Sequence, residues 1–261
     1  MPHNTEGQLI IRYQLIQIFM KTFLKLLSLC IFLSGVALTS CTGKKTANVL
    51  FITGGHDYDK ETFAELLAKL PITYDHVEHP NAHVMLKSDK ISKYDVVLLY
   101  DMPKEISEEE RADFIAMLEK GKGLVVLHHA FCSYDIWPEY VKIAGGRYHH
   151  YQWEKDGVMQ KPSTYMHDVK FDIKVEDPKH PITKGISDFS IIDEAYGNTE
   201  LLSTVHPLLS TNTPLNGPLV CWANNYGKSR VVTLTLGHDI QSWENPSFIE
   251  ILSRSILWVA Q

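Results

Sequence analysis

The feature that most constrains the fold is a regular alternation of short apolar segments with amphipathic ones, beginning at residue 48. The first apolar run, NVLFIT, is continuous, as expected for a strand that is buried on both faces. Further strands are predicted at 72–77, 95–102 and 123–129, and helical spacing of apolar residues appears at 60–70 and 107–121. This alternation predicts an α/β fold with a doubly wound, mostly parallel sheet and helices on both faces.

Capping residues support the predicted helices. Asp59 stands where it can cap the helix that follows it. Ser107 and Glu110 have the spacing of a capping box at the start of the next helix. Pro246 lies near the start of the last apolar segment, residues 246–261, whose apolar face predicts a C-terminal helix.

The middle of the chain is less regular and predicts an inserted, β-rich segment. Residues 146–200 contain three prolines, and the alternating stretch 169–175 suits an edge strand or a hairpin better than a central strand. We expect this segment to cover the functional edge of the sheet. Order returns in residues 218–238, where two apolar strands flank a predicted turn at 224–228.

The N-terminus has the layout of a secretory signal followed by a lipidation site. Residues 20–40 carry Lys21 and Lys25, and then an apolar run from 26 to 38 that is too short to predict a membrane span. The sequence LTSC, which ends at Cys41, resembles the bacterial lipobox, whose cysteine becomes the lipidated first residue of the mature protein. A buried N-terminal helix is the alternative interpretation.

The signal interpretation divides the chain into four parts. Residues 1–19 are predicted to be an over-extended start, 20–40 the lipoprotein signal peptide, 41–47 a short polar tether and 48–261 the α/β domain. We therefore predict a cell-envelope lipoprotein, at the periplasmic face or in the outer membrane. Its contact with the membrane would be the lipid on Cys41.

Two cysteines remain after this processing, and the overall charge is mildly negative. Cys132 and Cys221 could pair in an oxidising compartment or remain ordinary buried thiols, and we predict no disulfide. The net charge of −6 and the pI near 6.1 leave no basic surface for a phosphate backbone. We therefore expect no nucleic-acid partner.

Three histidines lie at or just beyond the ends of predicted strands. His56 follows the Gly54–Gly55 pair, His128 closes the run GLVVLHH, and His238 closes VVTLTLGH. Ligands bind at the carboxyl ends of strands in open α/β sheets, so we expect these side chains to share one rim. The segment DEAYG at 193–197 adds two carboxylates that could reach it. For each histidine alone, a hydrogen-bonded structural role is the alternative.

At these residues the sequence resembles the ThuA-like family, named from trehalose utilisation. The resemblance spans nearly all of residues 48–261 and rests on the order and spacing of FITGGHDY, GLVVLHHA, GGRYHH, HPITKGI, DEAYGN, PLVCWANNYGKSRVVTLTLGHD and WENPSFIEILSRSILW. It implies the flavodoxin-like fold of class I glutamine amidotransferases. It also implies a role in carbohydrate catabolism.

The chain departs from the amidotransferases at one decisive place. An amidotransferase of this fold needs a cysteine nucleophile at the sharp turn after the strand that here reads GLVVLHH. His128 stands at about that turn, and Cys132 comes four residues later. We therefore expect no glutamine amidotransferase activity.

The predicted rim has a ligand set that suits a divalent metal. Imidazoles of His56, His128 and His238 with the carboxylate of Glu194 would form a mixed nitrogen and oxygen site for zinc or another first-row ion. In the metal-free alternative, a histidine acts as general acid or base and Glu194 orients it. We expect no nucleotide cofactor.

The resemblance implies a substrate that a sugar oxidoreductase of the same pathway has first oxidised to a ketone. A 3-keto sugar or glycoside has an acidified hydrogen next to its carbonyl, so acid/base chemistry could drive hydrolysis, elimination or isomerisation. The predicted substrate-binding residues are Tyr58, His129, His150, Asp193, Tyr196 and Trp243, with the choice between His149 and His150 left open. The alternative function is a non-catalytic carbohydrate-binding lipoprotein.

Overall fold

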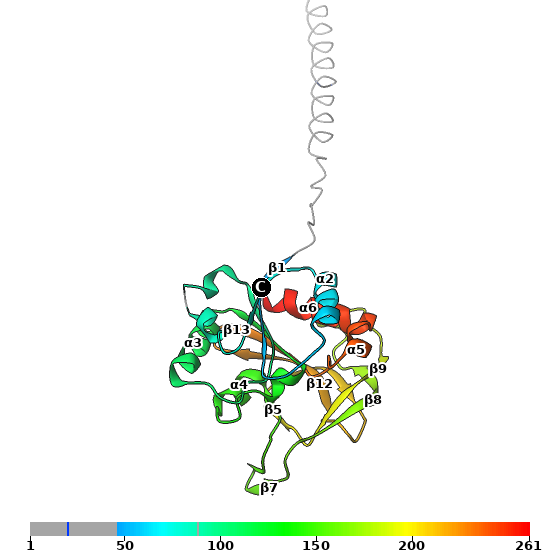
Figure 1. Cartoon of the computed structure of the whole chain (residues 1–261). Helices are drawn as coiled ribbons and strands as arrows, with labels where there is room; N and C mark the ends of the chain where they lie inside the picture. Colours follow the sequence, from blue (N-terminus) through cyan, green and yellow to red (C-terminus); the bar gives the residue numbers. More distant parts are fainter. Residues whose placement is uncertain (1–19, 21–45, 88) are drawn as a thin grey trace, which may run out of the picture. The chain divides into compact units, whose positions relative to one another are not determined.

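A nine-stranded mixed sheet runs through the α/β domain in the computed structural model, which describes Met20 and residues 46–87 and 89–261 (Figure 1). The predicted over-extended start, the signal peptide beyond Met20 and most of the tether lie outside the described residues. The strands lie in the order β2 (Ile72–Glu78), β1 (Ala47–Gly54), β3 (Val96–Asp101), β4 (Gly123–Leu127), β13 (Ser229–Leu234), β12 (Leu219–Tyr226), β11 (His206–Thr211), β8 (Thr164–Val175) and β9 (Phe189–Gly197).

The first five strands in this order are parallel, as the alternation of strands and helices predicts. Strand β1 pairs with β2 and β3 on its two sides, and β4 pairs with β3 and β13. Parallel neighbours place their carboxyl ends at one edge of the sheet, which is the edge that the three histidines were expected to share. The predicted α/β fold class is confirmed.

The remaining four strands are antiparallel and correct two details of the prediction. The stretch 169–175 is part of β8, which pairs antiparallel with the next main-sheet strand, β9, as the hairpin alternative predicts, but β9 rather than β8 forms the edge. The turn between β12 and β13 is shorter than 224–228, because the ladder continues to the pair Tyr226 and Ser229. The inserted segment therefore extends the sheet.

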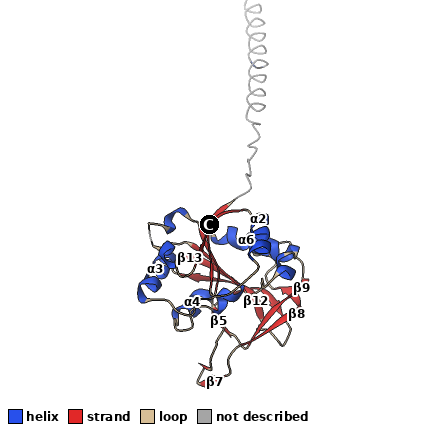
Figure 2. Cartoon of the chain, in the orientation of Figure 1, coloured by secondary structure: helices blue, strands red, loops and turns tan. Residues whose placement is uncertain are grey.

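Helices cover both faces of the sheet, as Figure 2 shows. Along β1, Val49 and Phe51 join a core with residues of the helices 60–69 and 246–259, whereas Leu50 and Ile52 join a core with residues of the helices 108–119 and 139–144. This alternation follows from the two-residue period of a strand and explains the continuous apolar run. The helices are α2 (Lys60–Lys69), α3 (Glu108–Glu119), α4 (Glu139–Ala144), α5 (Ile240–Trp243) and α6 (Pro246–Val259), with short 3-10 turns η1 (His83–Leu86), η2 (Ile91–Lys93) and η3 (His128–Cys132).

The predicted helix starts are confirmed by their hydrogen bonds. Asp59 accepts from the backbone N–H groups of Glu61 and Thr62. Ser107 and Glu110 form a reciprocal capping box, and Pro246 stands in the first turn of α6. Each cap satisfies donors that the helix itself cannot, which contributes about 1 kcal/mol.

Two small antiparallel sheets lie outside the main one. Strand β5 (Gly146–Arg147) pairs with β10 (Glu200–Leu201), and β6 (Trp153–Lys155) pairs with β7 (Val158–Gln160). The β6–β7 hairpin extends away from the main sheet in Figure 1. Cys132 and Cys221 are both buried free thiols. Among the described residues, no helix is long and apolar enough to span a membrane.

Candidate functional site

Neighbouring parallel strands bring His128 and His238 together. Leu127 at the end of β4 pairs with Leu234 at the end of β13, so the residues that follow both strands emerge side by side. His128 comes directly after β4, and His238 lies on the segment that leads from β13 into α5. Their ring centroids are 5.2 Å apart.

His128 adopts a left-handed backbone conformation with a φ of +50°. Non-glycine residues adopt this conformation at a cost of roughly 1–3 kcal/mol, and such strain gathers at functional sites. The turn aims a fully buried imidazole toward the carboxyl edge of the sheet.

Three side chains form a compact donor cluster at this turn. His128 Nε2 lies 3.2 Å from His238 Nδ1 and 3.2 Å from Glu194 Oε2. His238 Nδ1 lies 3.7 Å from the same Glu194 oxygen. Within the described part of the chain, one group of side chains has donor atoms that could hold a metal ion: His128, Glu194 and His238.

The spacing of these donors fits a tetrahedral zinc site. Zinc bonds of about 2.0–2.1 Å in tetrahedral geometry place neighbouring donor atoms about 3.3–3.4 Å apart, close to the observed separations. Two imidazoles and one carboxylate are also a ligand set that catalytic zinc sites use, with a fourth position left open. The residues present therefore fit a divalent metal.

The electrostatics of the cluster favour the ligating forms of Glu194 and His238. Burial opposes the charge on Glu194, but hydrogen bonds and charge interactions with His128, Tyr196 and His238 bring its pKa below the ordinary value. Burial, and then the nearby His128, lower the pKa of His238. An ionised carboxylate and a neutral imidazole are the forms that bind metals.

Asp193 and Tyr196, neighbours of Glu194 on β9, support the cluster differently. Asp193 is buried and accepts hydrogen bonds from the backbone N–H groups of Gly237 and His238 at 2.7 and 3.0 Å. Burial raises the pKa of the Asp193 carboxyl. The Tyr196 hydroxyl lies 3.0 Å from His128 Nε2, so Tyr196 and a metal ion would compete for contact with that nitrogen.

A cavity of about 270 Å³ opens beside the cluster. It is lined by His56, Met102, His129, Cys132, Tyr148, His150, Tyr165, His167, Glu194 and Tyr196. The lining combines residues at the ends of β1, β3 and β4 with residues of the inserted segment. The insertion thus contributes to the functional edge.

His56 belongs to the cavity wall but lies outside the three-residue cluster. The turn at Gly54 and Gly55, with φ of +115° and +83°, carries the exposed His56 over His129, and the two rings stack at 4.5 Å. Its Nδ1 donates to the carbonyl of Asp57 at 2.7 Å. His129 is buried, and burial holds the pKa of its imidazole well below the ordinary value.

Comparisons with known proteins agree with the sequence and the fold. A family model described as trehalose utilisation, ThuA, matches residues 48–259. The chain belongs to the ThuA family. Among proteins with curated descriptions, none matches it.

Solved structures share the fold of this ThuA-family protein at low sequence identity. A ThuA-like protein from Parabacteroides merdae has a TM-score of 0.67 and 21% identity, over 83% of this chain and 91% of that one. A ThuA-like protein from Bacteroides uniformis has a TM-score of 0.62 and 19% identity, over 81% of this chain and 90% of that one. PurLQS from Thermotoga maritima has a TM-score of 0.52 and 14% identity, over 82% of this chain and 99% of that one. The predicted amidotransferase-like fold is confirmed.

The thiol nearest the turn of this ThuA-family protein is poorly suited to nucleophilic chemistry. Cys132 ends η3 and is buried, and burial raises the pKa of its thiol well above the ordinary value. The thiolate is the reactive form of cysteine, so this environment opposes activation. His128 occupies the strained turn itself.

The contacts of the two rings place His149 and His150 differently relative to the cavity. His150 lines the cavity, and its Nε2 donates to the carbonyl of Cys132 at 3.1 Å. His149 points elsewhere, with Nε2 2.8 Å from Glu200 and its ring stacked on Trp153 at 4.2 Å. Only His150 of this pair therefore faces the cavity.

Three residues expected to bind substrate do not line the cavity. Asp193 is engaged with the loop backbone described above, and Trp243 is buried with its indole N–H donating to the Gly237 carbonyl at 2.8 Å. Tyr58 packs edge-on against Phe63 and Tyr100 in the core. Burial of apolar surface explains why the aromatic rings of Trp243 and Tyr58 lie where they do.

Sequence reasoning missed other residues of the cavity wall. Tyr148, Tyr165 and His167 line it from the inserted segment, and Met102 and Cys132 line it from the ends of β3 and η3. The available signal for His167 was a break in the alternation of β8, where the pairing with β9 shifts between Met166 and Val169. A sequence pattern indicates such a break only weakly, because a bulge needs no special residue.

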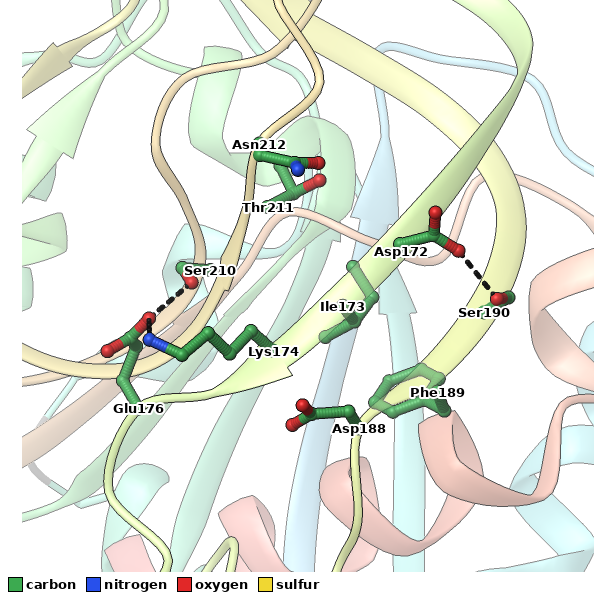
Figure 3. A pocket seen from close by; sticks show the side chains of 10 residues that line it. All are labelled: Asp172, Ile173, Lys174, Glu176, Asp188, Phe189, Ser190, Ser210, Thr211 and Asn212. Atoms are coloured by element: carbon green, nitrogen blue, oxygen red, sulfur yellow. Dashed lines mark hydrogen bonds and ion pairs between the residues drawn. The ribbon is translucent and has the colours of Figure 1, made fainter.

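A larger groove of about 490 Å³ lies on the antiparallel side of the sheet (Figure 3). Its carboxylates are already paired: Asp172 accepts from Ser190, and Glu176 accepts from Lys174 and Ser210. Its wall, from Asp172 to Asn212, includes none of the histidines discussed above. The histidine-lined cavity is therefore the better candidate for chemistry.

Proposed function

We propose that this ThuA-family protein is an envelope-anchored enzyme of carbohydrate catabolism that acts on oxidised, 3-keto sugars or glycosides. The chemistry is metal-assisted acid/base catalysis of the hydrolase, lyase or isomerase type. The observation that carries the proposal is the convergence of His128 Nε2, His238 Nδ1 and Glu194 Oε2 at 3.2–3.7 Å beside a cavity.

The chain's own residues supply the requirements of this chemistry. His128, Glu194 and His238 would hold the ion, which supplies Lewis-acid polarisation of a carbonyl when bound. Histidines along the cavity wall, including His56 and His150, provide bases for the acidified hydrogen next to a ketone. The cavity has the size of a single sugar ring, and the exposed ring of Tyr165 at its wall suits stacking on a sugar face.

The nature of the lining favours an uncharged ligand. None of the cavity residues is a lysine or an arginine, and the one carboxylate, Glu194, is engaged by His128. An anionic substrate would lack a cationic partner here, whereas the hydroxyl and carbonyl groups of a sugar find imidazole and phenol groups. The ketone itself would come from a sugar oxidoreductase of the same pathway.

Envelope anchoring is the second part of the proposal. It is supported by the basic and apolar leader and by Cys41 in the sequence. Of these residues the structure describes only Met20. Lipid at Cys41 would hold the domain at the periplasmic face or in the outer membrane. Residues 42–46 would serve as the tether, because Ala47, which the sequence assigned to the tether, is already a buried residue of β1.

Metal analysis of protein purified without a histidine tag tests the proposed site. The wild-type protein and His206→Ala should carry about one divalent ion per chain, whereas His238→Ala and Glu194→Gln should lose most of it. His206 is a matched control because it is an exposed histidine that contacts Asp177, away from the cluster. Full metal content in His238→Ala would remove the cluster from the proposal.

Screening keto-glycosides by mass spectrometry then tests the reaction class. Wild-type protein should convert at least one of them to a product of altered mass or chromatographic retention, and Glu194→Gln should not. Tight sugar binding without turnover would instead favour the non-catalytic carbohydrate-binding alternative.

A further inference from the structure

The pairing of β8 with β9 is interrupted next to the metal cluster. The register shifts between Met166 and Val169, and Asp168 has a left-handed φ of +56°. Gln241 in α5 donates to Asp168 Oδ1 at 2.8 Å and ties this bulge to the helix that follows His238. Bulges beside active sites re-aim side chains, and this one carries His167.

His167 lies against the cluster without belonging to its inner group of donors. Its Nδ1 is 3.4 Å from Glu194 Oε1, and its ring centroid is 4.7 Å from that of His238. Glu194 therefore presents one oxygen, Oε2, to His128 and the other, Oε1, to His167. The His167 ring lines the cavity and is 53% exposed.

These contacts place a suitable donor beside the position that the cluster leaves open. Three protein donors leave one corner of a tetrahedron free, and a neutral imidazole is a preferred ligand for zinc. Among the described residues, His167 has no hydrogen bond or ion pair besides its contact with Glu194. The half-exposed ring can thus rotate away from the cluster into solvent at the loss of its contacts with Glu194 and His238 alone.

We propose that His167 is a fourth, exchangeable metal ligand. Its ring completes the coordination shell of an ion held by His128, Glu194 and His238, and it gives way to an oxygen atom of the bound ligand. This inference rests on the proposed metal site and adds a residue that opens and closes it. The bulge at Asp168 fixes the backbone, so that the side chain alone makes the exchange.

Titration with Co²⁺, followed by visible absorption, tests this role independently of turnover. The wild-type protein and His206→Ala should give one intense ligand-field spectrum, and His167→Ala should give a weaker, shifted one as water replaces the imidazole. The Co²⁺ affinity of His167→Ala should fall roughly 10-fold or more. Free imidazole should restore the wild-type spectrum to His167→Ala.

Acetohydroxamate, a small oxygen donor, tests the exchange itself. Its addition should make the spectra of wild type and His167→Ala converge, because it displaces His167 from the one and water from the other. Identical spectra and affinities for the two proteins before addition would overturn the inference and leave the three-residue site intact. Absence of Co²⁺ binding to wild type would overturn the proposed metal site as well. Melting temperatures of the two metal-free proteins should match closely, since about half of the His167 side chain is exposed.

Discussion

The Nδ1 atom of His128 lies 2.8 Å from the backbone carbonyl oxygen of Thr235, which can only accept a hydrogen bond. Nδ1 therefore carries a proton, and Nε2 is the ring nitrogen that faces His238 and Glu194. The same contact links the end of β4 to the end of β13. A hydrogen bond from the second ring nitrogen to a carbonyl is typical of metal-ligating histidines.

Replacement of His128 should reveal the strain in its backbone. His128→Gly should be more stable than His128→Ala by about 0.5–1 kcal/mol, because glycine adopts a left-handed φ without the penalty of about 1–2 kcal/mol and loses only part of this gain to chain entropy. Chemical denaturation of both variants measures the difference. The same two substitutions at His206, in strand β11, should show the opposite order of stability, with the alanine variant the more stable.

Replacement of Gly55 should separate a steric clash from backbone strain. A Cβ at Gly55 would lie 2.5 Å from the Met102 carbonyl oxygen, and its φ is +83°. Gly157 has a similar φ of +78° with no atom within 4 Å of the added Cβ. Gly157→Ala should cost about 1 kcal/mol and Gly55→Ala about 1–3 kcal/mol more, measured by denaturant unfolding. Equal losses would show that the turn at Gly55 relaxes freely.

Acid should destabilise the fold partly through His129. Its pKa is held below the ordinary value by burial and then by the neighbouring His128 and His56. The carbonyl of Tyr100 opposes this effect, yet neither ring nitrogen makes a hydrogen bond of good geometry among the described residues. The unfolded chain takes up the proton first, so stability is present above a pH of about 6.5 and is lost as the pH falls below it.

His129→Phe keeps a ring between Tyr100 and His56 and removes this protonation. Its free energy of unfolding should fall less steeply between pH 6.5 and 5, by up to about 1.4 kcal/mol per pH unit. Removing an unpartnered buried polar group should also leave the variant at least as stable as wild type at pH 7.5. Parallel slopes for the two proteins would contradict a buried neutral His129.

Cys41→Ser should release the protein from membranes. We expect the wild-type protein in the membrane fraction, with the intact mass of a diacyl or triacyl cysteine at its N-terminus, and the variant in the soluble fraction or retained with an uncleaved leader. Two or more acyl chains are needed for stable anchoring. A mature form that still carries residues 1–19 would refute this processing.

The sequence by itself determined the alternation of the main strands and helices, whereas strand ends were only approximate: β4 stops at Leu127, two residues before the predicted end, because His128 begins a 3-10 turn. Apolar runs such as NVLFIT and the caps at Asp59 and Ser107 are local signals, since they depend on residues within one or two turns of chain. Once the sheet is parallel, the rule that its carboxyl ends share an edge is enough to bring His128 and His238 to one rim. That part of the candidate site was within reach of sequence reasoning.

Only the tertiary structure decided which partners meet at that rim. Glu194 comes from the edge strand β9, yet it contacts His128, whereas His56, which follows β1, stacks on His129 outside the cluster. His167 approaches through a bulge that no local pattern specifies. These relationships depend on strand order, register and side-chain packing between residues far apart in the chain, and such long-range pairings leave little trace in the local periodicity of a sequence.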